Sequence, residues 1–89
     1  MTAYRGPATL RIDDHDLAVE ALLDSRHEPV DGRLHWFGRI SGPALAAALG
    51  NRSADAALTT PEGSAPARVG DVDPWGRYRV SGIGVPPFD

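Results

Sequence analysis

Hydrophobic and polar residues alternate along most of this chain, with the period of two that is typical of strands with one buried face. The alternating segments, in chain order, are 7–13, 16–24, 33–40, 53–60, 65–69 and 77–85. The positions expected to face a common core are Ala8, Leu10, Ile12, Leu17, Val19, Ala21, Leu23, Leu34, Trp36, Ile40, Ala54, Ala56, Leu58, Ala65, Ala67, Val69, Tyr78 and Val80. About six short strands at close spacing predict an all-β fold, a small antiparallel barrel or sandwich.

One segment departs from this alternation and is typical of a short helix. Residues 43–49 are rich in alanine and leucine, with a proline in the first turn and Gly50 as a stop. So short a helix depends on tertiary packing, which we expect from Leu45 and Leu49 against the sheet. A helix is also the competing interpretation of residues 17–23, but they form no helical stripe, so a strand is predicted there.

Turn residues separate the predicted strands. Asp13 and Asp14 precede the second strand, and short aspartate side chains bond nearby backbone amides. The segment 28–32 ends in Asp-Gly, a strong hairpin signal, while 71–76 combines proline with glycine. Gly38 lies inside a strand, which predicts a bulge or a close approach of two backbones.

Two stretches of the chain echo each other. Segments 32–38 and 76–82 both begin with Gly-Arg and both end in glycine. Each begins where a turn leads into a strand. The echo indicates that the third and sixth strands hold equivalent places in the fold.

Composition narrows the class of protein. With 89 residues the chain forms a single domain, 1–89, whose thin core predicts self-association, most simply as a homodimer. The absence of cysteine excludes disulfides, thiol nucleophiles and zinc–thiolate sites. No apolar run has the length of a membrane span, and the N-terminal residues lack the apolar segment of a signal peptide. We therefore expect no membrane association and a cytoplasmic location.

Charge bears on the partners of the domain. The net charge of −3 argues against nucleic-acid binding, which needs a clustered basic surface. All nine basic residues are arginine, so lysine-based amine catalysis is excluded while bidentate contacts to anions are available. The sequence contains no phosphate loop and no dinucleotide fingerprint, and we predict no cofactor.

Most of the reactive side chains gather in residues 26–39. The histidines and carboxylates there fit no recognised metal-ligand spacing, so we favour a polar turn and predict no metal site. These residues are His27, Glu28, Asp31 and His35. If the protein is an enzyme, His35 is the candidate acid or base, because imidazole titrates near neutral pH. Asp31 or Glu28 would then set its tautomer, and Arg39 would orient the substrate.

A binding site is the alternative use of the same strand. The residues predicted to contact a ligand or a partner are Arg33, His35, Trp36, Phe37, Arg39, Trp75, Arg77 and Arg79. The four arginines among them, Arg33, Arg39, Arg77 and Arg79, form one anion site only if the third and sixth strands are neighbours. The competing interpretations are structural. The arginines would pair with nearby carboxylates, Trp36 would be a core residue, and Trp75 would cover one end of a barrel or face a partner.

Several motifs resemble a known bacterial family, the domain of unknown function 4873. They are Glu28-Pro-Val-Asp-Gly-Arg33, His35-Trp-Phe-Gly-Arg39, Thr60-Pro-Glu-Gly63, Asp73-Pro-Trp-Gly-Arg-Tyr-Arg-Val80 and Pro86-Pro-Phe88. The resemblance covers nearly the whole chain. It implies a domain found alone or joined to flavin-dependent monooxygenase or oxidoreductase modules, and therefore a flavin-dependent oxidoreductase as a possible partner, but no activity. Phe37 stands where tyrosine is common, and Glu62 where a second glycine is common.

Three functions follow as hypotheses. The first is a non-catalytic module that binds a small organic ligand or a protein and is associated with a flavin-dependent oxidoreductase. The second is a small cofactor-free isomerase, cyclase or dehydratase of secondary metabolism that uses His35. The third is a structural dimerisation domain. A deep pocket that holds His35 beside a carboxylate would favour the enzyme, and a two-fold interface would favour the dimerisation domain.

Overall fold

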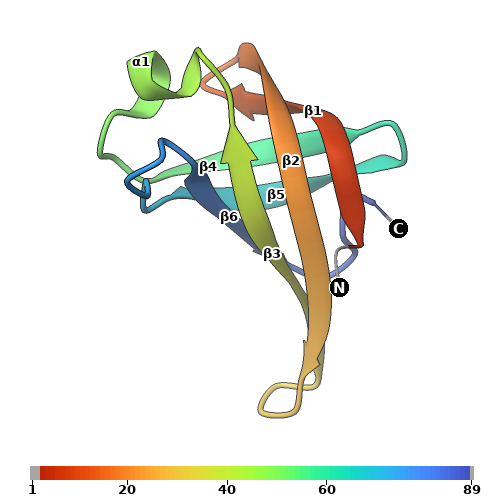
Figure 1. Cartoon of the computed structure of the whole chain (residues 1–89). Helices are drawn as coiled ribbons and strands as arrows, with labels where there is room; N and C mark the ends of the chain where they lie inside the picture. Colours follow the sequence, from red (N-terminus) through yellow and green to blue (C-terminus); the bar gives the residue numbers. More distant parts are fainter. Residues whose placement is uncertain (1–2, 89) are drawn as a thin grey trace.

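A computed structural model describes residues 3–88, with the side chain of Glu28 left aside. The elements are β1 (Tyr4–Ile12), β2 (His15–Glu28), β3 (Arg33–Ser41), α1 (Leu45–Leu49), β4 (Ala54–Thr60), β5 (Gly63–Gly70) and β6 (Tyr78–Ile83). The six strands close into an antiparallel barrel in the order β1-β2-β3-β6-β5-β4 (Figure 1). The all-β prediction is confirmed, and of its two forms the structure has the barrel.

The barrel consists of two three-stranded meanders, β1-β2-β3 and β4-β5-β6, with α1 in the connection between them. The meanders join along two antiparallel ladders, β3 with β6 and β1 with β4. β3 and β6 are thus the third strands of their respective meanders. This arrangement confirms that the two echoing segments hold equivalent places.

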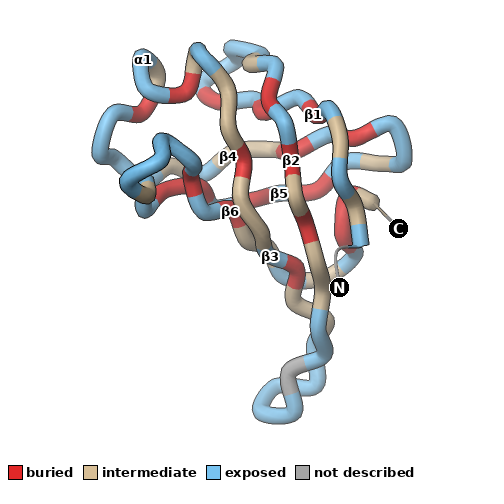
Figure 2. Tube along the Cα trace, in the orientation of Figure 1, coloured by how far each residue is buried: buried red, intermediate tan, exposed pale blue. Residues whose placement is uncertain are grey.

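The buried residues follow the predicted alternation (Figure 2). Leu10, Leu58, Val69 and Val80 are fully buried, and the remaining predicted positions are buried or half-buried. The half-buried ones are Leu17, Leu34, Ala54 and Ala56. Packing of these side chains removes apolar surface from water, at roughly 25 cal/mol for each Å² buried. The barrel interior is therefore a packed core.

The helix begins at Leu45, two residues later than predicted, because Pro43 and Ala44 form a turn. Leu45 and Leu49 are buried as expected. Gly50 ends the helix with a positive φ of 56°, and its N–H donates to the carbonyl oxygen of Ala46 at 2.9 Å. No helix in residues 3–88 is long and apolar enough to cross a membrane.

The turns have the backbone that their residues favour. Asp13 and Asp14 form a two-residue turn with φ of 49° and 66°, values that aspartate tolerates better than most residues. The β2–β3 turn contains Asp31 and Gly32, and Gly32 has a φ of 67°. Both segments were predicted as turns, and both are confirmed.

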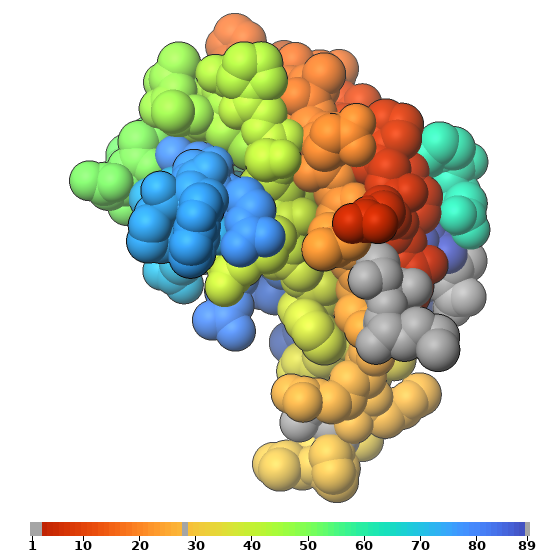
Figure 3. All heavy atoms as spheres, in the orientation of Figure 1, coloured from red at the N-terminus to blue at the C-terminus, as the bar shows by residue number. Residues whose placement is uncertain are grey.

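Several strand boundaries were predicted wrongly. β1 begins at Tyr4 rather than residue 7, and β5 runs from Gly63 to Gly70 rather than from 65 to 69. β2 continues to Glu28 rather than ending at residue 24, and β6 ends at Ile83 rather than residue 85. β6 ends because Gly84 has a φ of 103° and donates its N–H to the Leu34 carbonyl oxygen at 2.8 Å. The far ends of β2 and β3 pair only with each other, and they project from the barrel as a ribbon (Figures 1 and 3).

Gly38 is the point at which β3 crosses close to β2. A Cβ at this position would overlap the carbonyl oxygen of Leu22 and lie 2.9 Å from Cα of Leu23. Real Cβ atoms essentially never approach backbone so closely. The predicted close approach of two backbones is confirmed.

Candidate functional site

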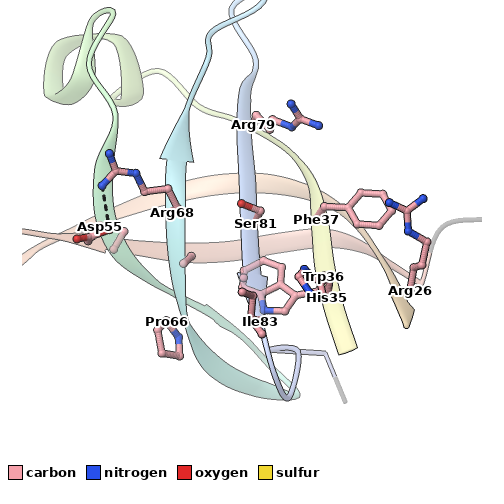
Figure 4. Close-up of a pocket in the computed structure, with 13 residues that line it drawn as sticks. Arg26, His35, Trp36, Phe37, Asp55, Pro66, Arg68, Arg79, Ser81 and Ile83 are labelled. Atoms are coloured by element: carbon pink, nitrogen blue, oxygen red, sulfur yellow. Dashed lines mark hydrogen bonds and ion pairs between the residues drawn. The ribbon is translucent and has the colours of Figure 1, made fainter. Parts of the chain in front are cut away.

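A groove lies where β5 and β6 separate. Their ladder has only three register pairs, from Arg68 opposite Ser81 to Gly70 opposite Arg79. Beyond Ser81 the two strands diverge, and the surface there is hollowed by a groove of about 780 Å³. Its walls come from β3, β4, β5 and β6, with Arg26 of β2 at one side (Figure 4). This volume is in the range of small-molecule sites.

Trp36 lies at the floor of the groove. Its side chain is 1% exposed, and its indole ring packs over Gly82, where any Cβ would overlap Nε1 of the indole. Within the described residues, this Nε1 has no hydrogen-bond partner. Buried polar groups are normally paired, so an unpaired indole N–H beside a groove is unusual.

A row of side chains crosses the groove. By register, Asp55 lies opposite Arg68, Arg68 opposite Ser81, and Ser81 opposite Phe37. Arg68 donates to Asp55 at 3.0 Å on one side. On the other side the Arg26 guanidinium lies 5.8 Å from the centre of the Phe37 ring (Figure 4). Ser81 is the small residue between them, which leaves room for a ligand.

His35 and Asp31 form a hydrogen-bonded pair beside the groove. Nε2 of His35 lies 2.9 Å from Oδ2 of Asp31, and the backbone N–H of Arg33 donates to Oδ1 at 2.9 Å. The N–H of Arg33 and the imidazole of His35 together lower the pKa of Asp31 below its usual range. An ionised carboxylate only accepts hydrogen bonds, so the imidazole donates one through Nε2. In the neutral imidazole Nδ1 is then the acceptor. The pair is a possible acid–base unit, but His35 is 28% exposed in an open groove rather than enclosed in a deep pocket.

Arg39 and Arg79 lie directly opposite each other on β3 and β6. A second, smaller hollow of about 280 Å³ is bordered by both of them and by Phe37. Arg79 and Phe37 also line the main groove, so the two hollows adjoin. The adjacency of β3 and β6, on which the predicted anion site depended, is therefore present.

Arg77 has a structural partner instead. Its Nε donates to Oδ2 of Asp73 at 2.8 Å, as the competing interpretation predicted. Oδ1 of Asp73 accepts the backbone N–H groups of Trp75 and Arg77, both at 2.9 Å. Burial would raise the pKa of Asp73, but these bonds outweigh it and lower the pKa below the usual range. Stability from this carboxylate is present above the pKa of an unfolded aspartate, near ~3.9, and is lost as pH falls through its lower folded pKa.

The same loop presents Trp75 to solvent. The ring is 79% exposed, and the Arg77 guanidinium lies 5.7 Å from its centre. The loop 71–77 stands out from the surface in light blue in Figure 3. The interpretation of Trp75 as a cover for one end of the barrel is wrong, because a ring covering the core would be buried. A contact with a partner stays a prediction.

The structure thus divides the predicted site residues into two groups. His35, Trp36, Phe37 and Arg79 line the groove, and Arg39 lies beside it. Arg33 lies on the projecting ribbon, and Trp75 and Arg77 border a separate shallow hollow. The alternative in which Glu28 sets the tautomer of His35 lies outside the described side chains. Among the residues that are described, no three His, Asp or Glu side chains gather to hold a metal ion.

Sequence reasoning missed several groove residues, namely Arg26, Pro66, Arg68, Ser81 and Ile83. Arg68 and Ser81 occupy polar positions of alternating strands, which look like ordinary solvent-facing positions. The only signal was indirect. Ser81 precedes the last glycine of the echo, which put its strand and the strand of Phe37 in equivalent places of the fold.

The fold and the groove define a class, a small closed β-barrel domain with an open groove on its outer surface. The family model described as Domain of unknown function (DUF4873) matches residues 1–89, and the chain belongs to this family. The resemblance carried by the motifs is confirmed. No solved structure gives a significant match.

Relatives occur in mycobacteria. Uncharacterized proteins of Mycobacterium tuberculosis and Mycobacterium bovis are each 36% identical to this chain over 85 residues. These residues are 96% of the chain but 24% of each relative. The chain therefore spans about a quarter of the length of the curated relatives it matches.

Proposed function

We propose that the domain is a non-catalytic module that binds a small organic ligand in the groove between β5 and β6. The observation that carries the proposal is the buried Nε1 of Trp36, which has no acceptor among residues 3–88 and lies at the groove floor. Leaving a buried donor unpaired costs about 1–3 kcal/mol. A ligand acceptor that entered where β5 and β6 are unpaired would remove that cost.

The lining of the groove suits such a ligand. Trp36, Phe37 and Ile83 supply apolar surface, while Ser81 and His35 supply hydrogen-bonding groups. Sites for small molecules combine these two features, a mainly apolar lining and a few polar groups that fix orientation. The ladder of β5 and β6 stops at Ser81. Beyond it β5 stays paired with β4 and β6 with β3, but not with each other, which leaves room for a ligand between them.

Fluorescence of Trp36 tests the proposal. In a Trp75→Phe background Trp36 is the single tryptophan, and we expect saturable energy transfer from it to bound N-phenyl-1-naphthylamine. Ser81→Tyr fills the middle of the groove and should weaken binding roughly tenfold or more, or about 1.4 kcal/mol. Ser64→Tyr, at an exposed position of β5 outside the groove lining, is the matched control and should bind normally. Normal binding by Ser81→Tyr, or no saturable binding at all, would overturn the proposal.

A catalytic role for His35 is the second candidate, favoured by its 2.9 Å hydrogen bond to Asp31. An acid–base residue works best where water is excluded and the substrate is held close to it. The groove is open, and Asp31 is also engaged by the turn that it caps. Binding is therefore the function that the geometry supports better.

We further propose that the module associates with itself and with a flavin-dependent oxidoreductase. The relatives carry about three quarters of their length outside the matched region, which is consistent with a companion module. Trp75 is the candidate contact, since exposed tryptophan beside arginine is typical of interaction hot spots.

Sedimentation velocity tests the self-association. We expect the wild-type domain to sediment as a dimer and Trp75→Ala as a monomer, because the variant removes most of the exposed aromatic surface of the 71–77 loop. At protein concentrations low enough for the wild type to be monomeric, urea unfolding of the two proteins should be the same, because association itself stabilises the folded state. A monomeric wild type, or a dimer that persists in Trp75→Ala, would contradict this role for Trp75.

A further inference from the structure

Three arginines lie on one row across the outer face of the barrel. By register Arg5 lies opposite Leu22, Leu22 opposite Arg39, and Arg39 opposite Arg79. Neighbouring strands are about 4.8 Å apart. Arg39 and Arg79 are therefore one strand spacing apart, and Arg5 lies two strand spacings from Arg39 on the same face. In a chain whose net charge is −3, this row concentrates positive charge.

These arginines differ from others in the molecule. Arg11, Arg68 and Arg77 each donate to a carboxylate, at 2.8 to 3.0 Å. Throughout residues 3–88, by contrast, neither Arg39 nor Arg79 has a carboxylate partner. Like charges directly opposite each other on adjacent strands destabilise a sheet. Opposed arginines without carboxylate partners therefore lower the stability of the sheet. Such a cost is expected at residues that bind a ligand.

The pair lies next to the groove. Arg79 and Phe37 line both hollows, and Arg39 borders the smaller one. In Figure 4 the side chain of Arg79 reaches from β6 toward β3, on the side where the Phe37 ring lies. A flat ligand resting against Phe37 would therefore bring one end within reach of both guanidinium groups. Asp24 borders the smaller hollow as well, and it would repel an anion placed away from the arginines.

We propose that the ligand of the groove is an organic anion, with its oxyanion bound by Arg39 and Arg79 and its apolar body against Phe37 and above Trp36. The inference rests on the proposed function of the groove and adds the chemical class of its ligand. Guanidinium is planar and carries several N–H donors, so two opposed arginines suit the oxygens of a carboxylate or a phosphate ester. Arg5 lies at the far end of the row and adds longer-range attraction.

Two probes that differ by a single sulfonate group separate the proposals. One is 8-anilino-1-naphthalenesulfonate, and the other is N-phenyl-1-naphthylamine, which has the same rings without the sulfonate. The measured quantity is the ratio of their dissociation constants on each protein. In Arg39→Gln and in Arg79→Gln we expect the preference for the anionic probe to fall roughly tenfold, because each variant removes one charged hydrogen-bonding group. The neutral probe should bind as before, which also reports an intact groove.

Arg52→Gln is the matched control, since Arg52 donates to the carbonyl oxygen of Ala48 away from the groove. It should leave the ratio unchanged. Added salt should reduce the preference in the wild type, and reduce it less in the two variants, each of which keeps one arginine of the pair. Competition by 1-naphthoate and by 1-naphthyl phosphate then shows whether a carboxylate or a phosphate is preferred.

If both probes bind and the ratio is the same in Arg39→Gln, Arg79→Gln and the wild type, the anion inference is overturned and the groove proposal stands. If neither probe saturates on the wild type, both are overturned. A preference lost equally in Arg52→Gln would show that net charge, rather than the opposed pair, attracts the probe.

Discussion

Gly38→Ala is expected to destabilise this barrel by about 3 kcal/mol or more, the upper end of the cost of overpacking. The added methyl group would overlap the carbonyl oxygen of Leu22 in the neighbouring strand. Flexible side chains can move aside, but this atom belongs to the backbone of β2. The strands must therefore separate, and the ladder of β2 with β3 would weaken. Small domains have only about 5–15 kcal/mol in total, so a large part of the stability would be lost.

Urea denaturation followed by far-ultraviolet circular dichroism measures the effect. Gly32→Ala is the matched control, because a Cβ there would meet no atom within 4 Å. Its cost comes from a φ of 67° alone and should be about 1–2 kcal/mol. Equal midpoints for the two variants would show that the close approach of β2 and β3 is not what excludes a side chain at position 38.

Trp36→Ala is expected to cost about 3–5 kcal/mol, because it removes the largest fully buried side chain of the core. The cavity left behind would lie under the groove, so the same variant should also lose probe binding. Trp36→Phe keeps most of the apolar volume and removes the indole N–H. We expect it to fold with a smaller loss of stability and to bind more weakly a ligand that pairs with that N–H.

Trp75→Ala makes the same substitution, tryptophan to alanine, at an exposed position instead of a buried one. Trp75 is 79% exposed, so the free energy of unfolding of the monomer, measured at a protein concentration below that of dimerisation, should change by no more than about 0.5 kcal/mol. Thermal unfolding of the two alanine variants measures the difference directly. A large loss of stability in Trp75→Ala, with little loss in Trp36→Ala, would reverse the assignment of core and surface.

The alternation of apolar and polar residues was enough to predict six strands, their inward faces and the helix. The boundary of β2 was missed for a physical reason. Ser25 to His27 lie where β2 leaves the barrel for the projecting ribbon, and the last two of them are exposed. A strand segment exposed on both faces has no apolar side to repeat, so its period of two does not appear in hydrophobicity.

The site was predictable only in part. Arg39 and Phe37 were recognised because they share a strand face with His35. Arg79 was recognised because its strand contains the second of the two echoing segments. Arg68 and Ser81 were missed because the groove depends on the register in which β5 and β6 pair. The groove forms where β5 stops pairing with β6. The residues of neither strand, taken alone, predict where that pairing ends. Long-range register depends on how both meanders pack, which local patterns do not encode.

The β4–β5 hairpin is joined to the rest of the barrel by two short ladders. β4 and β5 pair with each other through seven register pairs, but β4 is joined to β1, and β5 to β6, by three pairs each. Local opening follows the elements with the fewest bonds to break, so this hairpin is the least costly part of the barrel to displace. The groove lies at its edge. A ligand bridging β5 and β6 would therefore add contacts across one of the two short ladders and raise the melting temperature of the whole domain.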